Sequence, residues 1–253
     1  MSGHNRWSKL KRFKAVQGVA KGKLYSKLIK EITVAARMGG GDPAGNPRLR
    51  TAVELAREAN MPQENIVRAV KKGTGELQGV NYEEAVYEGY GPAGVAMVVE
   101  CLTDNKHRTA GDVRNAFATG GGNLAAEGAV AWNFDRRGVI EVKPGPTEDL
   151  VIEAAILGGA EDVVGLGAGG GEGFEVRTHP NDLHAVAAAL EARRFALGGR
   201  RLAYLPRDTV KLTDPEKARQ LLKLVDLLED QDDVQSVHAN FEIDDAVMDQ
   251  VAV

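Results

Sequence analysis

Apolar residues recur at three- and four-residue spacing through the first part of the chain, a pattern typical of amphipathic helices. Over residues 23–38 this spacing links Leu24, Leu28 and Ile32, and the glycine-rich GGGDP at 39–43 ends the pattern. We therefore predict a first helix at 23–38.

Two further helices are predicted from their start and stop signals. One starts at Asn46, a good N-cap residue, with Pro47 at the first helical position. The next follows Asn60, has Pro62 in its first turn and ends at Gly73. Three helices joined by short Gly/Pro loops predict a small helical domain.

After residue 80 the pattern changes to runs suited to strands. VYEGY at 86–90 and VAMVVECL at 95–102 are separated by GPAG and predict a hairpin. Thr109 and Asp112 predict a capping box that opens a helix, and AVAWNF at 129–134 predicts the next strand.

The remaining chain alternates strands and helices, ending with the strand TVKLT, the helix PEKARQLLKLVDLLED and the strand VQSVHANF. We predict an α+β multidomain protein on this basis. Its parts are a basic arm plus three-helix domain at 1–80, a discontinuous ferredoxin-like βαββαβ domain at 81–134 and 206–253, and an inserted α/β domain at 135–205.

Composition indicates a folded chain in a reducing compartment. Apolar residues make up 43% and charged residues 27% of the chain, as in ordinary globular proteins. With Cys101 as the single cysteine, neither an intramolecular disulfide nor a cysteine-based zinc cage can form. The N-terminus lacks an apolar signal-peptide core, and runs such as VAMVV at 95–99 are too short to span a bilayer. We expect a soluble, cytoplasmic protein without a membrane partner.

The net charge of −4 conceals a strong asymmetry along the chain. Residues 1–80 hold 16 Lys and Arg against 6 Asp and Glu, whereas the other 173 residues hold 16 against 30. Such asymmetry indicates a nucleic acid or another acidic surface as the partner of the basic segment.

Lysines on the first predicted helix form a stripe, because Lys23, Lys27 and Lys30 are spaced to share one face. Phosphates are the natural ligands, and such binding weakens steeply with salt. Trp7 and Phe13 suggest either base stacking or docking of the arm onto its own helices. The predicted nucleic-acid-binding residues are Arg6, Trp7, Lys9, Lys11, Arg12, Lys14, Lys21, Lys23, Lys27, Lys30, Arg37, Arg48, Arg50, Arg68, Lys71 and Lys72.

A second anion site is predicted at Lys106, His107 and Arg108, which precede a predicted helix start. The alternative is a polar loop without a ligand. The acidic run EDQDD at 229–233 is interpreted as the solvated end of a helix rather than a magnesium site.

Catalytic and cofactor signals are weak. The GxGxxG pattern at 165–170 is followed by a strand instead of the helix that a dinucleotide site requires. His179 and His184 have no third ligand nearby, so no metal is expected. Without a set of nucleophile, base and orienting residue, we expect neither an enzyme nor a bound cofactor.

Three segments together resemble one family: KLIKEITVAARMGGGDPAGNPRLRTAV, NMPQENIVRAVKKGTGELQGVNYEEAVYEGYGPAGVAMVVECLTDNKHRT and NLAAEGAVAWNF. They are similar to the YebC/PmpR family. The resemblance implies a DNA-binding transcriptional regulator. Some relatives, including the organellar translational activator of cytochrome c oxidase, instead imply a translation factor that acts on the ribosome at proline-rich stretches. Asn5, Arg6, Phe13 and Glu127 depart from the usual pattern.

We predict a non-enzymatic nucleic-acid-binding regulator of gene expression, and the alternative from another class is a scaffold or an unrecognised enzyme. DNA and ribosomal RNA both fit as partners, and the acidic domains would orient the basic domain or recruit the ribosome or another protein. No predicted helix carries the Asn, Gln and Arg cluster of a base-reading surface, so the expected contacts are with phosphates.

Overall fold

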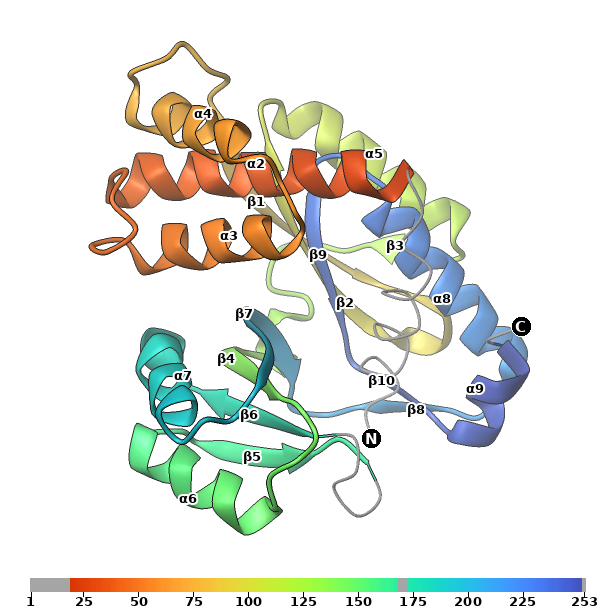
Figure 1. The fold of residues 1–253 in the computed structure, drawn as a ribbon. Helices are drawn as coiled ribbons and strands as arrows, with labels where there is room; N and C mark the ends of the chain where they lie inside the picture. Colours follow the sequence, from red (N-terminus) through yellow and green to blue (C-terminus); the bar gives the residue numbers. More distant parts are fainter. Residues whose placement is uncertain (1–18, 168–172, 252–253) are drawn as a thin grey trace. The chain divides into compact units, whose positions relative to one another are not determined.

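In the computed structural model of the chain, residues 19–167 and 173–251 are described. The fold is a mixture of helices and antiparallel sheets with a helical N-terminal region, and it divides into two compact units (Figure 1). The smaller unit spans Phe134–Arg207, and the larger is built from the segments on either side of it. The separation of residues 1–80 as a domain of its own stays a prediction.

The larger unit has this order of elements: α2 (Val19–Gly39), α3 (Pro47–Glu58), α4 (Gln63–Thr74), β1 (Glu83–Tyr90), η1 (Pro92–Gly94), β2 (Ala96–Thr103), α5 (Lys106–Thr119), β3 (Asn123–Leu124), η2 (Ala131–Asn133), β8 (Val210–Leu212), α8 (Pro215–Glu229), β9 (Val234–Ala239), β10 (Phe241–Ile243) and α9 (Asp245–Val251).

Helices α2, α3 and α4 confirm the predicted helical region and share a core that includes Ile32, Leu49 and Ile66. The Asn46 side chain accepts a hydrogen bond from the Leu49 amide, as expected of an N-cap. The predicted end of α4 at Gly73 is wrong. Gly73 lies inside the helix, and Gly75, with a φ of +84°, forms the left-handed C-cap.

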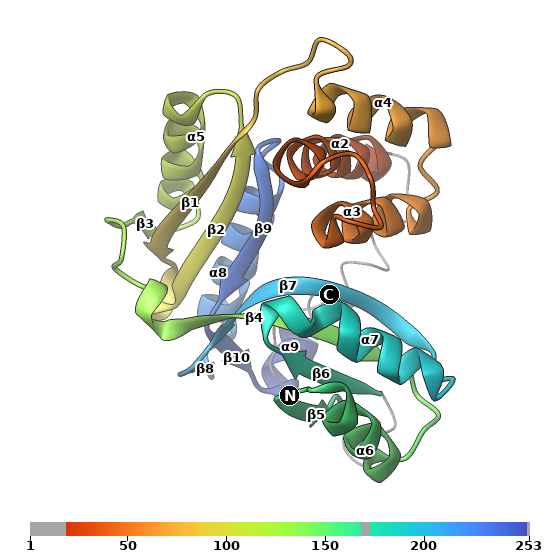
Figure 2. The same cartoon turned by 90° about the vertical axis from the view of Figure 1, so that its left-hand side faces the viewer.

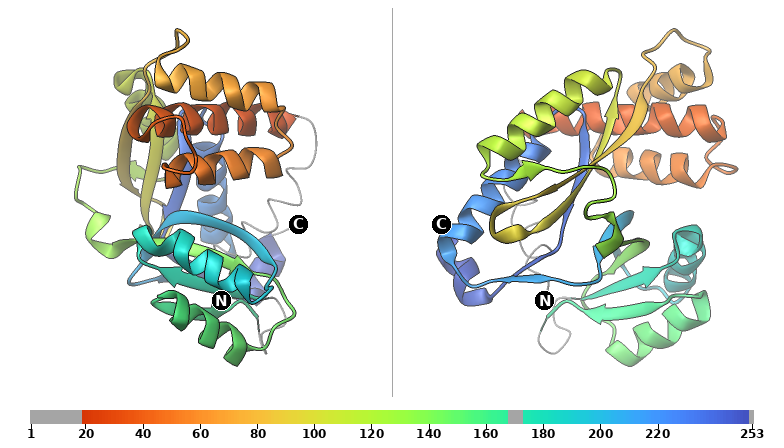
Figure 3. Two further views of the ribbon diagram at one scale, coloured as in Figure 1. Left: turned by 60° about the vertical axis from the view of Figure 1, so that its left-hand side comes forward. Right: turned by 180° about the vertical axis from the view of Figure 1, so that it is seen from behind.

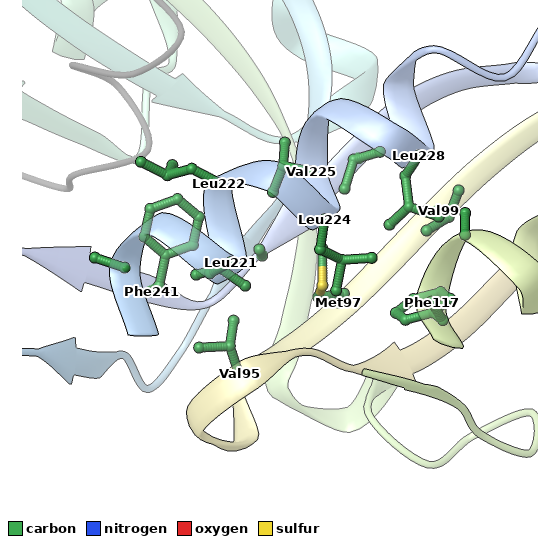
Figure 4. Packing of buried hydrophobic residues seen from close by; sticks show 14 of the residues in the cluster. Val95, Met97, Val99, Phe117, Leu221, Leu222, Leu224, Val225, Leu228 and Phe241 are labelled. Atoms are coloured by element: carbon green, nitrogen blue, oxygen red, sulfur yellow. The ribbon is translucent and has the colours of Figure 1, made fainter. Parts of the chain in front are cut away.

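The β1–β2 hairpin is confirmed and lies in an antiparallel sheet with the order β3-β1-β2-β9. Helices α5 and α8 contribute to one large hydrophobic core with this sheet. Figure 4 shows Leu224 and Leu228 of α8 beside Met97 and Val99 of β2. Helix α5 starts earlier than predicted, because Asn105 caps it by accepting a hydrogen bond from the Arg108 amide at 3.1 Å.

The strand predicted at 129–134 is wrong, because the Glu88 carboxylate shapes this segment into a turn. It accepts hydrogen bonds from the backbone amides of Gly128, Val130 and Ala131 at 2.7–2.8 Å. These amides are therefore not available to a strand ladder, and η2 follows. Burial of Glu88 works to raise its pKa, but the three amide donors outweigh burial and hold the pKa below its usual value.

The smaller unit has the βαββαβ order that was predicted for the discontinuous domain. Its elements are β4 (Phe134–Val142), α6 (Glu148–Gly158), β5 (Asp162–Gly165), β6 (Phe174–Thr178), η3 (Pro180–Asp182), α7 (Leu183–Ala192) and β7 (Leu197–Pro206). The strand order is β5-β6-β4-β7 and every pairing is antiparallel, which is the ferredoxin-like arrangement. Helices α6 and α7 lie side by side along this sheet (Figures 2 and 3). They share a core with β4 and β6.

The prediction therefore placed the ferredoxin-like arrangement in the wrong segment. Phe134, the last residue of the strand predicted at 129–134, begins β4 of the smaller unit. The predicted strand TVKLT forms β8, which pairs in parallel with β10 in a separate two-stranded sheet. Neither segment joins the β3-β1-β2-β9 sheet.

We expect Gly73→Ala to lower the free energy of unfolding by about 2 kcal/mol, because the added methyl group overpacks the helical core. A Cβ at this position would lie 2.4 Å from the Thr33 carbonyl oxygen and 2.7 Å from the Ala36 Cβ. Urea denaturation followed by circular dichroism measures the change. Gly22→Ala in α2 is the control, because its Cβ would meet no atom within 4 Å. The control should be neutral or stabilising by up to about 1 kcal/mol. Equal stability of the two variants would contradict the packing described for Gly73.

Candidate nucleic-acid interface

Helix α4 carries three of the predicted nucleic-acid-binding residues, and their role stays a prediction. Its buried residues Ile66 and Ala69 face the helical core, and Arg68, Lys71 and Lys72 share another face. Arg68 and Lys71 are exposed, and Lys72 is half-buried. Within 19–167 and 173–251, these three side chains make no ion pair or hydrogen bond. We call these three residues the α4 basic face.

Three α2 lysines, Lys23, Lys27 and Lys30, have partners in their own chain. Their ammonium groups contact residues 229–233, where α8 ends and the chain turns into β9. The predicted solvated role of this acidic run is therefore wrong for Asp233, which is buried, whereas Asp230 and Asp232 are exposed. The contacts are Lys23 Nζ to Asp230 Oδ1 (3.1 Å), Lys27 Nζ to the Glu229 carbonyl (2.7 Å), and Lys30 Nζ to the Asp232 carbonyl (2.9 Å) and to Asp233 Oδ1 (2.6 Å). Phosphate contact by these lysines stays a prediction that would require an exchange of partners.

Asp233 is the centre of this contact, with its side chain only 9% exposed. Besides Lys30, its carboxylate accepts hydrogen bonds from Arg108 at 2.7 Å, Thr109 at 2.8 Å and Thr103 at 3.0 Å. Burial of the carboxyl works to raise its pKa, but the donors Lys30, Arg108 and Thr109 outweigh burial and hold the pKa of Asp233 far below its usual range. We call Asp233 and these four donors the Asp233 cluster.

The predicted second anion site stays a prediction, and two of its three residues pair with carboxylates of the chain itself. Arg108 in the first turn of α5 binds Asp233 and also Asp104, at 2.7 Å each. Lys106 pairs with Glu83 at 2.8 Å, and His107 is exposed. Cations do lie at a helix N-terminus here, and one of the two carboxylates that Arg108 binds, Asp233, lies 125 residues away in the chain.

Three predicted arginines hold the local backbone and side chains of the larger unit. Arg37 donates hydrogen bonds to Asn81 and to the Val80 and Tyr82 carbonyls. Arg48 binds Glu31 and Glu84, and Arg50 binds the Pro43 and Ala44 carbonyls. Lys21 is exposed. The predicted residues Arg6, Trp7, Lys9, Lys11, Arg12 and Lys14 lie outside the described residues.

Sequence reasoning missed Asp233 as a functional partner of the basic stripe. No local signal marks it, because Lys30 and Asp233 are 203 residues apart in the chain. The run of acidic residues at the end of α8 is visible in the sequence, but a charge run shows no preferred partner. Exposed Arg57 on α3 is also absent from the predicted set, although it adds to the charge of the helical region.

Other reactive side chains lie in structural positions. Burial, with the nearby Asp233 carboxylate, raises the pKa of the Cys101 thiol to about 12, so this cysteine is a poor nucleophile. The Ser236 hydroxyl donates to Glu100 at 2.6 Å, and His238 Nε2 lies 2.9 Å from the same carboxylate oxygen. Ser236 therefore donates its hydroxyl hydrogen to a carboxylate. In a Ser-His-Asp triad, by contrast, one histidine nitrogen faces the serine and the other faces the carboxylate. Among the described residues, no group of three or more His, Cys, Asp or Glu is arranged to hold a metal ion.

The fold thus places an N-terminal helical region with exposed cations before α+β elements with antiparallel sheets. The chain belongs to the TACO1/YebC family, as its sequence resemblance predicted. The family's N-terminal domain model matches residues 5–76, and the model of its second and third domains matches residues 82–241.

The relatives include a protein from Myxococcus xanthus that is 61% identical over 251 residues, covering 99% of both chains. Another from Desulfotalea psychrophila is 50% identical and covers 100% of both chains. Both carry the name probable transcriptional regulatory protein. The crystal structure of a conserved hypothetical protein from Aquifex aeolicus is 48% identical, with a TM-score of 0.80, and the match covers 90% of this chain and 92% of that one. Of the helices within 19–167 and 173–251, none is long and apolar enough to cross a membrane.

We expect Asp233→Asn to lower the free energy of unfolding at neutral pH by about 2 kcal/mol, because Lys30 and Arg108 lose a buried anionic partner. The folded pKa of Asp233 is depressed, so its stabilising effect is complete above the unfolded value of about 4 and is lost as pH falls below it. The difference between the unmodified protein and the variant should therefore shrink in acid.

Thermal unfolding across a pH series measures this difference. Asp232→Asn is the matched control, because Asp232 contacts Lys30 through its main-chain carbonyl, which the substitution retains. A pH-independent difference for Asp233→Asn, or an equal effect of the control, would contradict the role of the Asp233 carboxylate.

Proposed function

We propose that this chain is a DNA-binding regulator of transcription that docks on phosphates through its helical region. The observation that carries the proposal is the α4 basic face, where Arg68, Lys71 and Lys72 project from one helix without an internal anionic partner among the described residues. The names of the Myxococcus and Desulfotalea relatives support the same reading.

The distribution of charge supports an oriented approach to the polyanion. Residues 1–80 carry a net charge of +10 and the remaining residues one of −14, so phosphates attract one part of the sequence and repel the other. Cations in the helical region then bind phosphates and release counterions. Part of the acidic charge is neutralised within the fold, as at Asp233, but the cations of the α4 basic face keep theirs.

Phosphate contact alone supplies affinity without reading base sequence. The α4 basic face therefore accounts for docking, and selectivity for particular sites has to come from the shape of the DNA or from another protein. The smaller unit is our candidate for recruiting such a protein, because its residues 134–207 include none of the predicted phosphate-binding cations.

We expect the combined substitution Arg68→Ala, Lys71→Ala and Lys72→Ala to weaken binding to a DNA duplex about tenfold or more at low salt. The slope of log affinity against log salt should also fall by up to about 0.9 for each phosphate that the variant no longer neutralises. Fluorescence anisotropy of a labelled duplex, titrated at several salt concentrations, measures both quantities.

The matched control removes three exposed cations elsewhere in the larger unit, with Arg114→Ala, Lys217→Ala and Lys223→Ala. Both triple variants have the same net charge, so a difference between them reports the position of the cations. Equal loss of affinity would overturn the assignment to α4. Competition with a matched RNA duplex and with ribosomal RNA forms the second arm, and strong preference for ribosomal RNA would favour the translation-factor alternative over the regulator of transcription.

A further inference from the structure

The contact between α2 and the end of α8 has the chemistry of a phosphate site filled from within the chain. Lys23, Lys27 and Lys30 lie at positions i, i+4 and i+7 of α2 and point to a single segment, residues 229–233. Two of its carboxylates, those of Asp230 and Asp233, contact the lysines, together with main-chain carbonyls at and just after the C-terminus of α8. A helix C-terminus bears the negative end of the helix dipole. To the three ammonium groups it presents closely spaced negative oxygens, as a nucleic-acid backbone does.

We infer that residues 229–233 form an internal acidic cap on the α2 lysines, and that a bound polyanion displaces this cap. The inference rests on the proposed function and adds a regulatory step to it. In the capped state, in which residues 229–233 hold the three lysines, only the α4 basic face and neighbouring cations bind the nucleic acid. In the open state Lys23, Lys27 and Lys30 exchange protein oxygens for phosphate oxygens.

The exposure of the ion pairs indicates where displacement begins. The outer pair is open to water, since the side chains of Lys23 and Asp230 are 44% and 74% exposed. Such a pair is held weakly and is screened by salt. The inner pair of Lys30 and Asp233 is only 12% and 9% exposed, so it is the part that holds the cap closed. A polyanion therefore competes first for Lys23 and then for the inner lysines.

Opening the cap leaves neither side with an uncompensated buried charge. Asp233 keeps its hydrogen bonds from Arg108, Thr109 and Thr103, all of which belong to the sheet and α5. Lys30 moves from a protein carboxylate to water or phosphate. A buried pair whose separation stranded one charge would resist opening strongly, but these partners avoid that cost.

The two hydrophobic cores are also compatible with opening. The cluster of α2, α3 and α4 includes Leu28, Ile32 and Leu49, and the cluster of the sheet with α5 and α8 includes Met97 and Leu224. The two clusters share no residue, and none of the three lysines belongs to either of them. Release of the lysines therefore breaks no contact within either cluster.

The test compares affinity for a labelled DNA duplex after removal of the cap's carboxylates. Asp230→Asn with Asp233→Asn should bind about tenfold more tightly than the unmodified chain, and Asp230→Asn alone about threefold, because competition for the lysines is reduced. The salt slope of the double variant should be steeper, since added phosphate contacts release more counterions. Glu148→Gln with Asp149→Asn, on exposed α6 residues, is the control for simple loss of negative charge.

Lysine acetylation followed by mass spectrometry reports the cap directly without DNA. Lys30 should react faster in the double variant than in the unmodified chain, with exposed Lys217 as the internal reference. Asp230→Asn keeps the Asp233 cluster, so its affinity for the DNA duplex can be measured even when the double variant folds poorly.

Tighter binding by the cap variants, with a smaller effect in the control, is the result expected. If the unmodified chain binds DNA and loses binding on α4 substitution, but the cap variants bind no more tightly than the control, the cap is structural and the inference fails alone. If the unmodified chain binds no nucleic acid, the proposed function fails and the cap mechanism fails with it.

Discussion

The Asp233 carboxylate is the interaction on which the larger unit most depends. It brings together Lys30 from α2, Thr103 from β2, and Arg108 and Thr109 from the start of α5. A carboxylate buried this deeply would be unfavourable without such donors. Because the four donors come from three elements, the same carboxylate that needs them also joins the helical region to the sheet.

This arrangement changes how the charge of the chain is understood. In the sequence, the basic stripe of α2 and the acidic run after α8 resemble two solvated surfaces, but in the fold they are partners. Among the described residues, Lys23 and Lys30 are engaged in ion pairs, whereas Arg68, Lys71 and Lys72 are not. A count of basic residues alone does not show which of them are paired within the fold.

Features set by local chemistry could be predicted from the sequence. The Asn46 cap, the helices around it and the β1–β2 hairpin follow from spacing and turn residues within a few positions. Features set by distant partners could not. The turn at 128–131 depends on Glu88, about 40 residues earlier, and the ferredoxin-like order was assigned to the wrong segment because the local pattern at that turn predicts a strand. Likewise, the anion at Arg108 comes from 125 residues away. The role of the α4 cations as a nucleic-acid interface stays a prediction.

Ultraviolet crosslinking of the tagged protein in growing cells tests whether the helical region docks on DNA, when the crosslinked peptides are mapped and the attached nucleic acid is sequenced. We expect discrete DNA segments attached to peptides from the first 80 residues, including α4. Crosslinks confined to residues 134–207, or ribosomal RNA as the sole nucleic acid recovered, would contradict this expectation.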